Sequence, residues 1–359
     1  MEEIKIGKVL LVFRNVLVAA VGPTFLVLIG ISLFFAMSEG LLRLIYPSWN
    51  EYGSRFFTQI SQPKHGNMLI GIAGFEGYFS QNNGDFRTHL RINQAGLRND
   101  TPIGAADNSI WIVGDSMAFG WGVDRDKIYT ARLNQYSKQP TYNVAAPGGN
   151  LCSYQGLLSR MPSGIKPKAV VLGLLMENDV IKYDCRLRAK QQENAGNIVN
   201  DNNFSISKGW LTNNSAVYNV ITNSLKRIPF INAALVKLRV SKDSHGYIQF
   251  CEKRDIEICV STTVNEIEYL RNMLPKDTPF VVLVAAARFE IRDDDPFYRA
   301  FRVAMLKKLR ANNIDYIDTF DQFKLAGFEA THFKHDGHWV PLGHKIAGKL
   351  LSSWFKGKF

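Results

Sequence analysis

The feature that most constrains this chain is an apolar stretch near its beginning. Residues Val16 to Met37 contain no Asp, Glu, Lys, Arg or His. A helix of about 20 apolar residues crosses the hydrocarbon core of a bilayer, and a cleaved signal peptide has a shorter apolar region before a small-residue cleavage site. A buried core helix usually carries polar positions. The stretch therefore predicts an uncleaved transmembrane anchor within residues 1–40.

Positive charges flank this stretch unevenly. Lys5, Lys8 and Arg14 precede it, whereas only Arg43 follows closely. Cytoplasmic flanks of membrane spans carry the excess of Lys and Arg. We therefore expect a single-pass protein of the bacterial inner membrane, with a cytoplasmic N-terminus and an extracytoplasmic, periplasmic globular part after Met37.

The chain carries a formal net charge of +11 and has a pI near 9.4. Nucleic acid, anionic lipid and acidic polysaccharide are all compatible neighbours of such a chain. The basic residues are scattered, however, and the sequence has neither a long basic run nor a zinc-finger or RNA-binding signature. We therefore expect a solvated basic surface and no nucleic-acid partner.

The chain contains four cysteines: Cys152, Cys185, Cys251 and Cys259. In an oxidising compartment, four cysteines can form two disulfides in any of three connectivities, and buried free thiols are an equal alternative. No C-x-x-C pair is present. The sequence therefore indicates neither a redox motif nor a cofactor.

Residues 41–108 are predicted to form a juxtamembrane stalk and a small lead-in module. Ser38 to Ile45 keeps helical apolar spacing and stops before Pro47, as expected where a proline ends a helix. Short alternating runs such as Thr88 to Asn93 suggest a few strands joined by turns.

From Ser109 the pattern changes to compact apolar runs, each followed by a polar loop and a helix-compatible stretch. The predicted strands are residues 110–113, 142–146, 169–175, 280–286 and 314–317. Continuous apolar strands alternating with helices are typical of a parallel sheet covered on both faces. We therefore predict a three-layer α/β/α domain over residues 109–359.

About 100 residues separate the third and fourth predicted strands, which is more than a crossover needs. We place an insertion at about residues 183–262. Its part Gln191 to Ser215 is rich in Asn, Gln and Ser, whereas Ala216 to Val240 has helical periodicity interrupted at Pro229. The insertion is either a lid or partner-binding flap, or a purely structural excursion, because long surface inserts cost little loop-closure entropy.

Polar loops follow the predicted strands, at the edge where parallel α/β sheets bind ligands. Acyl transfer needs a hydroxyl nucleophile, a base and a group that fixes the tautomer of the base. Ser116 follows the first predicted strand and precedes a helix, so it is the candidate nucleophile; an ordinary N-cap serine is the alternative. His338 is the candidate base, and Asp336 lies on the same loop, where it can orient the ring.

The same chemistry needs hydrogen-bond donors for the oxyanion. Gly148 has no side chain to shield its backbone N–H, and Asn178 carries a donor amide; a turn glycine and a strand-end asparagine are the structural alternatives. Four neighbours of these loops are candidate substrate contacts: Asp115, Glu177, Trp121 and Trp339. Aromatic residues at such positions are more often packing residues.

Four residues stand in the order and the loop contexts of the SGNH (GDSL-type) hydrolase superfamily, which the chain resembles over residues 109–355: Ser116, Gly148, Asn178 and His338. The surrounding segments are similar to the blocks of that family: Gly114-Asp115-Ser116, Asn143 to Gly149, Glu177-Asn178-Asp179 and Asp336-Gly337-His338. The segment Arg91 to Arg98, placed after an anchor, resembles the N-terminal portion of bacterial anchored members.

The resemblance implies a flavodoxin-like fold, a shallow open site, and an oxyanion hole made by the N–H groups of Ser116 and Gly148 and the side chain of Asn178. Two departures are visible: Met176 and Glu177 precede Asn178 without the usual glycine, and the last block is D-x-H where many members have D-x-x-H. Glu177 would narrow the site or disfavour anionic substrates. The D-x-H spacing is similar to that of periplasmic enzymes that acetylate exopolysaccharides. The sequence contains no G-x-S-x-G elbow of the ordinary α/β hydrolases.

A histidine cluster in the C-terminal part suggests a rival metal site: His332, His335, His338 and His344. Their spacing is compatible with metal binding in principle. There is no H-E-x-x-H motif, however, and a Pro341-Leu342-Gly343 turn separates the last histidine from the others. We therefore predict no metal.

The sequence predicts a membrane-anchored extracytoplasmic serine esterase that removes acyl or acetyl groups from envelope glycan or lipid esters. One alternative is an O-acetyltransferase that acts on an envelope polysaccharide, with a membrane partner that passes acyl groups across the bilayer. A non-catalytic scaffold for polysaccharide assembly is the other, although the intact set of catalytic residue types counts against it. A lid made from Ala216 to Val240 would favour a lipid-like acyl chain, whereas an open groove would favour a glycan.

Overall fold

The computed structural model describes residues 2–51, 55–81, 84–194, 210–238, 251–356 and 358. The chain divides into two compact units, Met1–Asn50 with Asn203–Leu225, and Glu51–Asn202 with Lys226–Phe359. The boundary expected between residues 108 and 109 therefore lies inside the second unit, which contains the lead-in strands and the α/β sheet together.

The first unit is built on the long helix α1, Glu2–Ile45. One window of the described residues, Gly22–Ile45, is long and apolar enough to cross a membrane by length and composition, and none of it is buried. It overlaps the expected anchor over residues 22–37. Near its end, the carboxylate of Glu39 accepts hydrogen bonds from the backbone N–H groups of Ala216 and Val217, at 2.7 and 3.0 Å. Glu39 thus caps the start of helix α7, Ala216–Arg227.

The second unit contains a five-stranded parallel sheet, as predicted. Its strands are β5 Ile110–Gly114, β6 Thr141–Ala145, β7 Ala169–Leu175, β8 Phe280–Ala285 and β9 Asp315–Asp318. They lie in the order β6-β5-β7-β8-β9, and each neighbouring pair is parallel. The reversal of strand order at β5 brings the loops after β5, β6 and β7 to one place at the carboxyl edge of the sheet.

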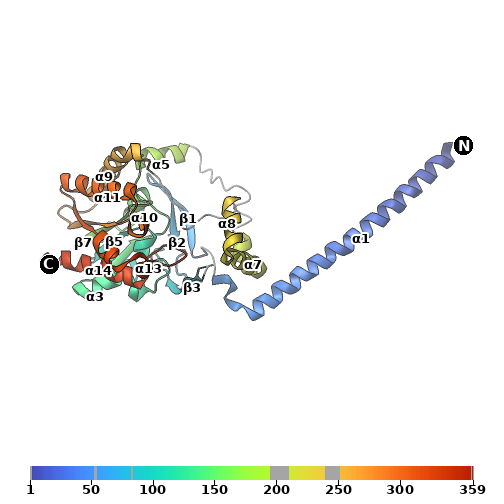
Figure 1. Ribbon diagram of the computed structural model, residues 1–359, viewed down its shortest axis with the longest axis horizontal. Helices are drawn as coiled ribbons and strands as arrows, with labels where there is room; N and C mark the ends of the chain where they lie inside the picture. The colour runs from blue at the N-terminus through green and yellow to red at the C-terminus, as the bar shows by residue number, and fades with distance from the viewer. Residues whose placement is uncertain are drawn as a thin grey trace. The chain divides into compact units, whose positions relative to one another are not determined.

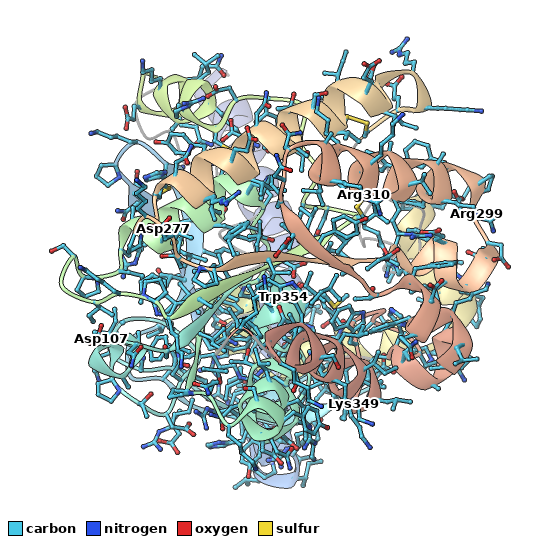
Figure 2. The ribbon with its side chains drawn as sticks, turned by 90° about the vertical axis from the view of Figure 1, so that its left-hand side faces the viewer. Asp107, Asp277, Arg299, Arg310, Lys349 and Trp354 are labelled. Carbon is cyan, nitrogen blue, oxygen red and sulfur yellow. A yellow bond between two sulfur atoms is a disulfide. The ribbon has the colours of Figure 1, made fainter. Side chains whose placement is uncertain are left out.

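Apolar side chains alternate between the two faces of this sheet. Val170, Leu172 and Leu174 of β7 join one core cluster, whereas Val171 and Leu175 join the other. The first cluster includes residues of helices α4 Leu151–Ser159, α9 Ile256–Asn272 and α11 Pro296–Ala311, and the second includes residues of α3 Tyr129–Ser137 and α14 Pro341–Phe355. Figure 2 shows the helix of Arg310 above the sheet and that of Lys349 and Trp354 below it, so the predicted three-layer arrangement is confirmed.

Shorter elements complete the second unit, and Figure 1 labels four of them, α5, α8, α10 and α13. The elements are η2 Ile103–Ala106, α2 Ser116–Phe119, η3 Arg125–Lys127, α5 Cys185–Asn194, α8 Pro229–Lys237, η4 Lys253–Asp255, α10 Arg288–Asp293, α12 Phe320–Ala326 and α13 Phe328–Thr331. The short helix η1, Pro47–Glu51, ends where the second unit begins. The lead-in residues form two antiparallel hairpins, as expected from their alternating runs: β1 Phe57–Gln62 with β2 Gly66–Gly71, and β3 Glu76–Ser80 with β4 Arg87–Arg91.

The insertion between β7 and β8 is partly helical. The predicted interruption at Pro229 is confirmed, because α7 ends at Arg227 and α8 begins at Pro229. Residues 195–209 and 239–250, which hold much of the Asn-rich part and the last two residues of the predicted 216–240 helix, lie outside the described residues.

The four cysteines form two disulfides, Cys152–Cys185 and Cys251–Cys259. This pairing decides among the three connectivities and the free thiols that the sequence left open. The first bridge joins the starts of α4 and α5, so it ties the entry of the insertion to the α/β layers.

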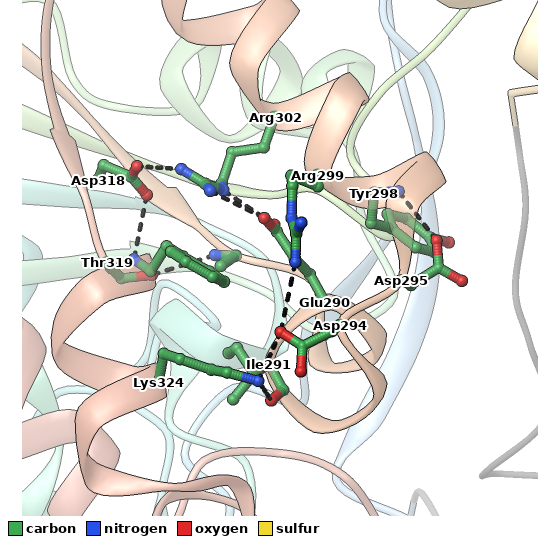
Figure 3. Close-up of polar contacts among 12 residues, drawn as sticks. Glu290, Ile291, Asp294, Asp295, Tyr298, Arg299, Arg302, Asp318, Thr319 and Lys324 are labelled. Carbon is green, nitrogen blue, oxygen red and sulfur yellow. Dashed lines mark hydrogen bonds and ion pairs between the residues drawn. The ribbon is translucent and has the colours of Figure 1, made fainter.

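A buried ion pair joins α10 to α11 (Figure 3). The guanidinium of Arg302 makes two hydrogen bonds of 2.8 Å to the carboxylate of Glu290, which is fully buried, and also pairs with Asp318 at the end of β9. Thr319 follows, and its hydroxyl accepts a hydrogen bond from the backbone N–H of Ala286 after β8. These contacts fix the edge of the sheet that lies beyond β8.

Candidate active site

Ser116 stands at the sharp turn between β5 and α2. Asp115 is the N-cap of α2, because its carboxylate accepts a 2.8 Å hydrogen bond from the backbone N–H of Met117. Ser116 is the first residue of the helix, so the alternative of an N-cap serine does not apply. Gly114 permits the tight turn, since a Cβ there would lie 2.8 Å from the Cβ of Ala118.

The structure brings Ser116, His338 and Asp336 into one hydrogen-bonded line. His338 Nε2 lies 2.8 Å from Ser116 Oγ, although the two residues are 222 positions apart in the chain. The other ring nitrogen, Nδ1, hydrogen bonds to Oδ1 of Asp336, which also accepts the backbone N–H of His338 at 3.3 Å. With Nδ1–H donated to Asp336, Nε2 is free to accept the serine proton.

The electrostatics of this line favour an ionised carboxylate beside a basic imidazole. Burial raises the pKa of Asp336, but the charge of His338 and its hydrogen bonds outweigh burial and leave the pKa below its ordinary value. Burial lowers the pKa of His338, but the carboxylate of Asp336 outweighs burial and leaves that pKa above its ordinary value. The two groups therefore stabilise each other's charged forms.

Two residues outside the predicted triad also hold the line in place. Gln81 Nε2 donates a 2.6 Å hydrogen bond to Oδ2 of Asp336, the oxygen that His338 leaves unused. The ring of Trp121 stacks on that of His338, with 5.6 Å between centroids and 28° between planes. Sequence reasoning flagged Trp121 only as a possible substrate contact, and it missed Gln81, because no local pattern links a hairpin residue to a loop 255 positions away.

The hairpin loop between β3 and β4 contacts the loop of His338 a second time. Asp85 accepts hydrogen bonds from the backbone N–H and from Nδ1 of His335, at 2.8 and 2.7 Å. Phe86 packs against Phe333 with 5.2 Å between ring centroids. The lead-in module therefore supports the loop of His338 directly.

The predicted oxyanion donors follow the strands on either side of β5. Gly148 lies after β6 with a left-handed φ of 72°, and Asn178 lies after β7. The Asn178 side chain is half-buried, and its hydrogen bond to Asp115 is one of the interactions that lower the pKa of that carboxyl. Since β6 and β7 flank β5, all three loops meet at the edge that carries Ser116.

Three of the four expected substrate contacts are buried against other protein groups. Asp115 caps α2, and burial raises the pKa of its carboxyl. Glu177 accepts a 2.6 Å hydrogen bond from the backbone N–H of Arg288 and lies 3.0 Å from its guanidinium. Trp339 is 1% exposed and packs on Phe323, so its correct interpretation is packing. Of the four, Trp121 alone is partly exposed beside His338.

The other three histidines of the C-terminal cluster each have a partner of their own. His332 Nδ1 lies 2.9 Å from the hydroxyl of Thr331, His335 pairs with Asp85, and His344 Nδ1 accepts the backbone N–H of Tyr129 at 3.3 Å. Within the described ranges, no group of three or more His, Cys, Asp or Glu side chains is placed to hold a metal ion.

Two buried ionisable residues fix the loops beneath the site. Asp179 accepts 2.7 Å hydrogen bonds from the backbone N–H of Leu175 and from the hydroxyl of Tyr154, which holds the loop of Asn178. Arg98 donates to the carbonyl groups of three residues at the end of α2 and in the loop that follows it: Phe119, Gly120 and Val123. Burial lowers the pKa of Arg98 to about 10, so the guanidinium still carries its charge at neutral pH.

No protein-family model and no curated protein matches the chain. Among solved structures, it is similar to a member of the lipolytic protein G-D-S-L family from Veillonella parvula, with 12% identity over 69% of this chain and 98% of that one and a TM-score of 0.38. It is also similar to a lipase/acylhydrolase from Enterococcus faecalis, with 11% identity over 70% and 96% of the two chains and a TM-score of 0.41. The chain is also similar to a carbohydrate esterase family 2 enzyme with a carbohydrate-binding domain from Corynascus thermopiles. The identity is 14% over 71% of this chain and 67% of that one, and the TM-score is 0.41.

Proposed function

We propose that the chain is a membrane-anchored serine ester hydrolase of the SGNH type, with Ser116 as nucleophile, His338 as general base and Asp336 as orienting carboxylate. The observation that carries this proposal is the line of hydrogen bonds from Asp336 through His338 to Ser116, with 2.8 Å between His338 Nε2 and Ser116 Oγ. An imidazole in this position can take the hydroxyl proton as the oxygen attacks a carbonyl carbon.

In the proposed reaction, His338 Nε2 takes the proton while Ser116 Oγ bonds to the ester carbonyl carbon. The oxyanion accepts hydrogen bonds from the N–H groups of Ser116 and Gly148 and from the amide of Asn178. The bond to the alcohol oxygen then breaks, and His338 returns the proton to the leaving alcohol. Water attacks the acyl-serine by the same route, which releases the acid and restores Ser116.

The apolar helix, the positive charges before it and the two disulfides support an extracytoplasmic position for the second unit. An enzyme anchored there would meet acyl and acetyl esters of envelope glycans and lipids. These are the substrates that we propose.

An O-acetyltransferase is the second candidate, and the spacing of Asp336 and His338 in the last block supports it. In this case a polysaccharide hydroxyl replaces water in the second step, and a membrane partner supplies the acyl group. The assembled triad argues against a non-catalytic scaffold, since nothing in scaffolding requires a serine, a histidine and an aspartate in line.

The test is Ser116-dependent release of 4-nitrophenol from its acetate, butyrate and octanoate by the full chain in detergent micelles. Ser116→Ala and His338→Ala should abolish release and labelling by a fluorophosphonate probe. Ser353→Ala, which changes an exposed serine on α14, should behave as wild type. If the wild-type chain releases no more than Ser116→Ala and is not labelled, the hydrolase proposal fails. Acetyl transfer to an added polysaccharide in place of acetate release would favour the transferase.

A further inference from the structure

A cavity of about 130 Å³ lies beside the candidate oxyanion donor Gly148. Gly148 and Asn150 line it from the loop after β6, and Arg188 lines it from α5. Because β6 pairs with β5, the loop of Gly148 and Ser116 lie at the same edge of the sheet. We propose that this cavity binds an anionic group, a carboxylate or a phosphate, of the ester substrate, an inference that rests on the hydrolase function proposed above.

A disulfide and a hydrogen bond between lining residues hold the walls of the cavity in place. The disulfide Cys152–Cys185 joins two of its lining residues, one at the start of α4 and one at the start of α5. From the same helix α5, Gln192 Oε1 accepts a 3.1 Å hydrogen bond from the backbone N–H of Asn67, next to the β1–β2 turn. A cavity braced in this way is preorganised, so little conformational entropy is lost when a ligand binds.

The charge of the lining favours an anion. It contains the guanidinium of Arg188 and, among these described residues, no Asp or Glu. Arg188 hydrogen bonds to the hydroxyl of Tyr183 and lies over its ring, with 4.4 Å from Cζ to the ring centroid, which orients the side chain. A guanidinium has five N–H donors and binds carboxylate or phosphate in a bidentate manner. Glu193, which follows the lining residue Gln192, instead accepts the backbone N–H of Lys64.

Neutral donors and acceptors complete the lining, among them the side chains of Asn67, Asn150 and Ser153. These groups suit the hydroxyls that surround a charged substituent on a sugar better than they suit an alkyl chain. The sequence suggested that Glu177 would disfavour anions, but its carboxylate is paired with Arg288 and buried. Its charge is therefore compensated before any substrate binds.

The volume of the cavity limits what it can hold. Its volume of about 130 Å³ is well below the roughly 300–1,000 Å³ of sites that hold drug-sized ligands, so the cavity suits a single small substituent better than a long acyl chain. The substrate class that fits is a short-chain ester of an acidic sugar, with the carboxylate or phosphate near the acylated hydroxyl.

The test compares three acetates as substrates of the full chain in detergent: an O-acetylated methyl glucuronoside, the matched O-acetylated methyl glucoside, and an O-acetylated glucose 6-phosphate. We expect kcat/KM to be about tenfold higher for at least one charged acetate than for the neutral one. Arg188→Ala should reduce this ratio to about one, and Arg188→Lys should keep part of it. Arg186→Ala is the matched control, because Arg186 lies on the same helix, pairs with Asp184 and does not line the cavity.

Binding provides a readout that does not depend on turnover. The glucuronoside and the sugar phosphate are titrated calorimetrically into Ser116→Ala with and without Arg188→Ala. Arg188-dependent binding without any Ser116-dependent hydrolysis would refute the hydrolase and leave the anion cavity standing. A preference for the uronoside alone or for the phosphate alone identifies the anion. Equal kcat/KM values for charged and neutral acetates, a ratio unchanged in Arg188→Ala, or no binding of either anion overturns the proposal.

Discussion

At the scale of single residues, three separate parts of the chain position the ring of His338. Asp336 binds Nδ1, Ser116 lies at Nε2, and Trp121 covers one ring face. Holding a base in contact with its nucleophile before substrate arrives removes an entropic cost from the reaction. The pH dependence of the rate should therefore report on the neighbours of His338.

Replacing Asp336 by Asn tests the carboxylate. Asp336 keeps the pKa of His338 above its ordinary value of 6.5, and a base must be neutral to act. The wild-type kcat/KM should therefore rise with pH through a midpoint above 6.5. Without the negative charge, the pKa of His338 falls, so the midpoint should move to lower pH, while kcat drops on the order of 10⁴-fold because Asn favours the wrong tautomer.

Asp315→Asn, at an exposed carboxylate paired with Lys358, is the control and should leave the pH profile unchanged. A midpoint that stays in place in Asp336→Asn would show that Asp336 does not act on the base.

Gln81→Ala should shift the same profile in the opposite direction. The amide N–H of Gln81 draws negative charge toward Oδ2 of Asp336. Its loss leaves more charge facing His338, which raises the pKa of the base and moves the midpoint to higher pH, and kcat/KM should fall by about tenfold. Gln62→Ala, in the other hairpin, removes an exposed hydrogen bond to Ser159 and should leave the midpoint of the pH profile unchanged. A purely structural role for Gln81 would lower the rate without shifting the midpoint.

At the scale of elements, the β3–β4 hairpin does more than precede the sheet. Its loop contacts the loop of His338 through Gln81, which hydrogen bonds to Asp336, and through Asp85, which hydrogen bonds to His335. The last block of the site is thus supported by residues that lie before the first strand of the sheet. The geometry of the proposed site therefore depends on the packing of the hairpins as well as on the α/β layers.

The buried pair of Arg302 and Glu290 has a stability consequence. Arg302→Met would leave the fully buried carboxylate of Glu290 without its partner. The loss of one member of a buried ion pair costs about 3–5 kcal/mol, so the free energy of unfolding measured in urea should fall by about that amount. Arg310 lies on the same helix as Arg302, and its guanidinium makes an exposed hydrogen bond to the hydroxyl of Tyr316 on β9. Arg310→Met should therefore lower the free energy of unfolding by less than about 1 kcal/mol. If the two changes lowered the free energy of unfolding equally, the buried ion pair of Arg302 and Glu290 would not have the stabilising role expected here.

At the scale of the whole molecule, we propose a membrane topology from charge and hydropathy. The uneven distribution of Lys and Arg around the apolar helix predicts that the C-terminus lies outside the cytoplasm. Alkaline phosphatase, which needs disulfides to be active, should therefore be active when fused after Phe359 in a bacterial host, and a cytoplasmic reporter fused there should be inactive. The reverse result would place the site in the cytoplasm.

The disulfide Cys152–Cys185 should stabilise the second unit, since it closes a loop with a sequence separation of 33. By chain entropy, a loop of this size contributes about 3–4 kcal/mol. We expect the Cys152→Ser/Cys185→Ser protein to unfold at lower urea, and Cys251→Ser/Cys259→Ser, with a separation of 8, to lose less. Peptide mapping without reductant should recover both bridges, and any other pairing would contradict the fold.

The sequence by itself determined the layered architecture and the order of the chemical groups. The strands β5, β7 and β8 are continuous apolar runs, and such runs are recognisable in the sequence because both faces of each of these strands are buried. Ser116 was a candidate because it directly follows a predicted strand, at the edge where parallel sheets bind ligands. Asp336 and His338 follow no predicted strand, and the polar content of their loop made them candidates. The break at Pro229 was predictable because proline cannot continue a helix.

Only the tertiary structure decided which distant groups meet. The pairing of the cysteines, the hydrogen bond from Gln81 to Asp336 and the burial of Trp339 each depend on contacts between segments far apart in the chain. Such contacts produce no periodic pattern in the sequence, because the distant partner of a side chain is set by how the layers pack and not by the residues next to it. Local propensity sets the elements, and the energy of packing those elements together selects the contacts between them.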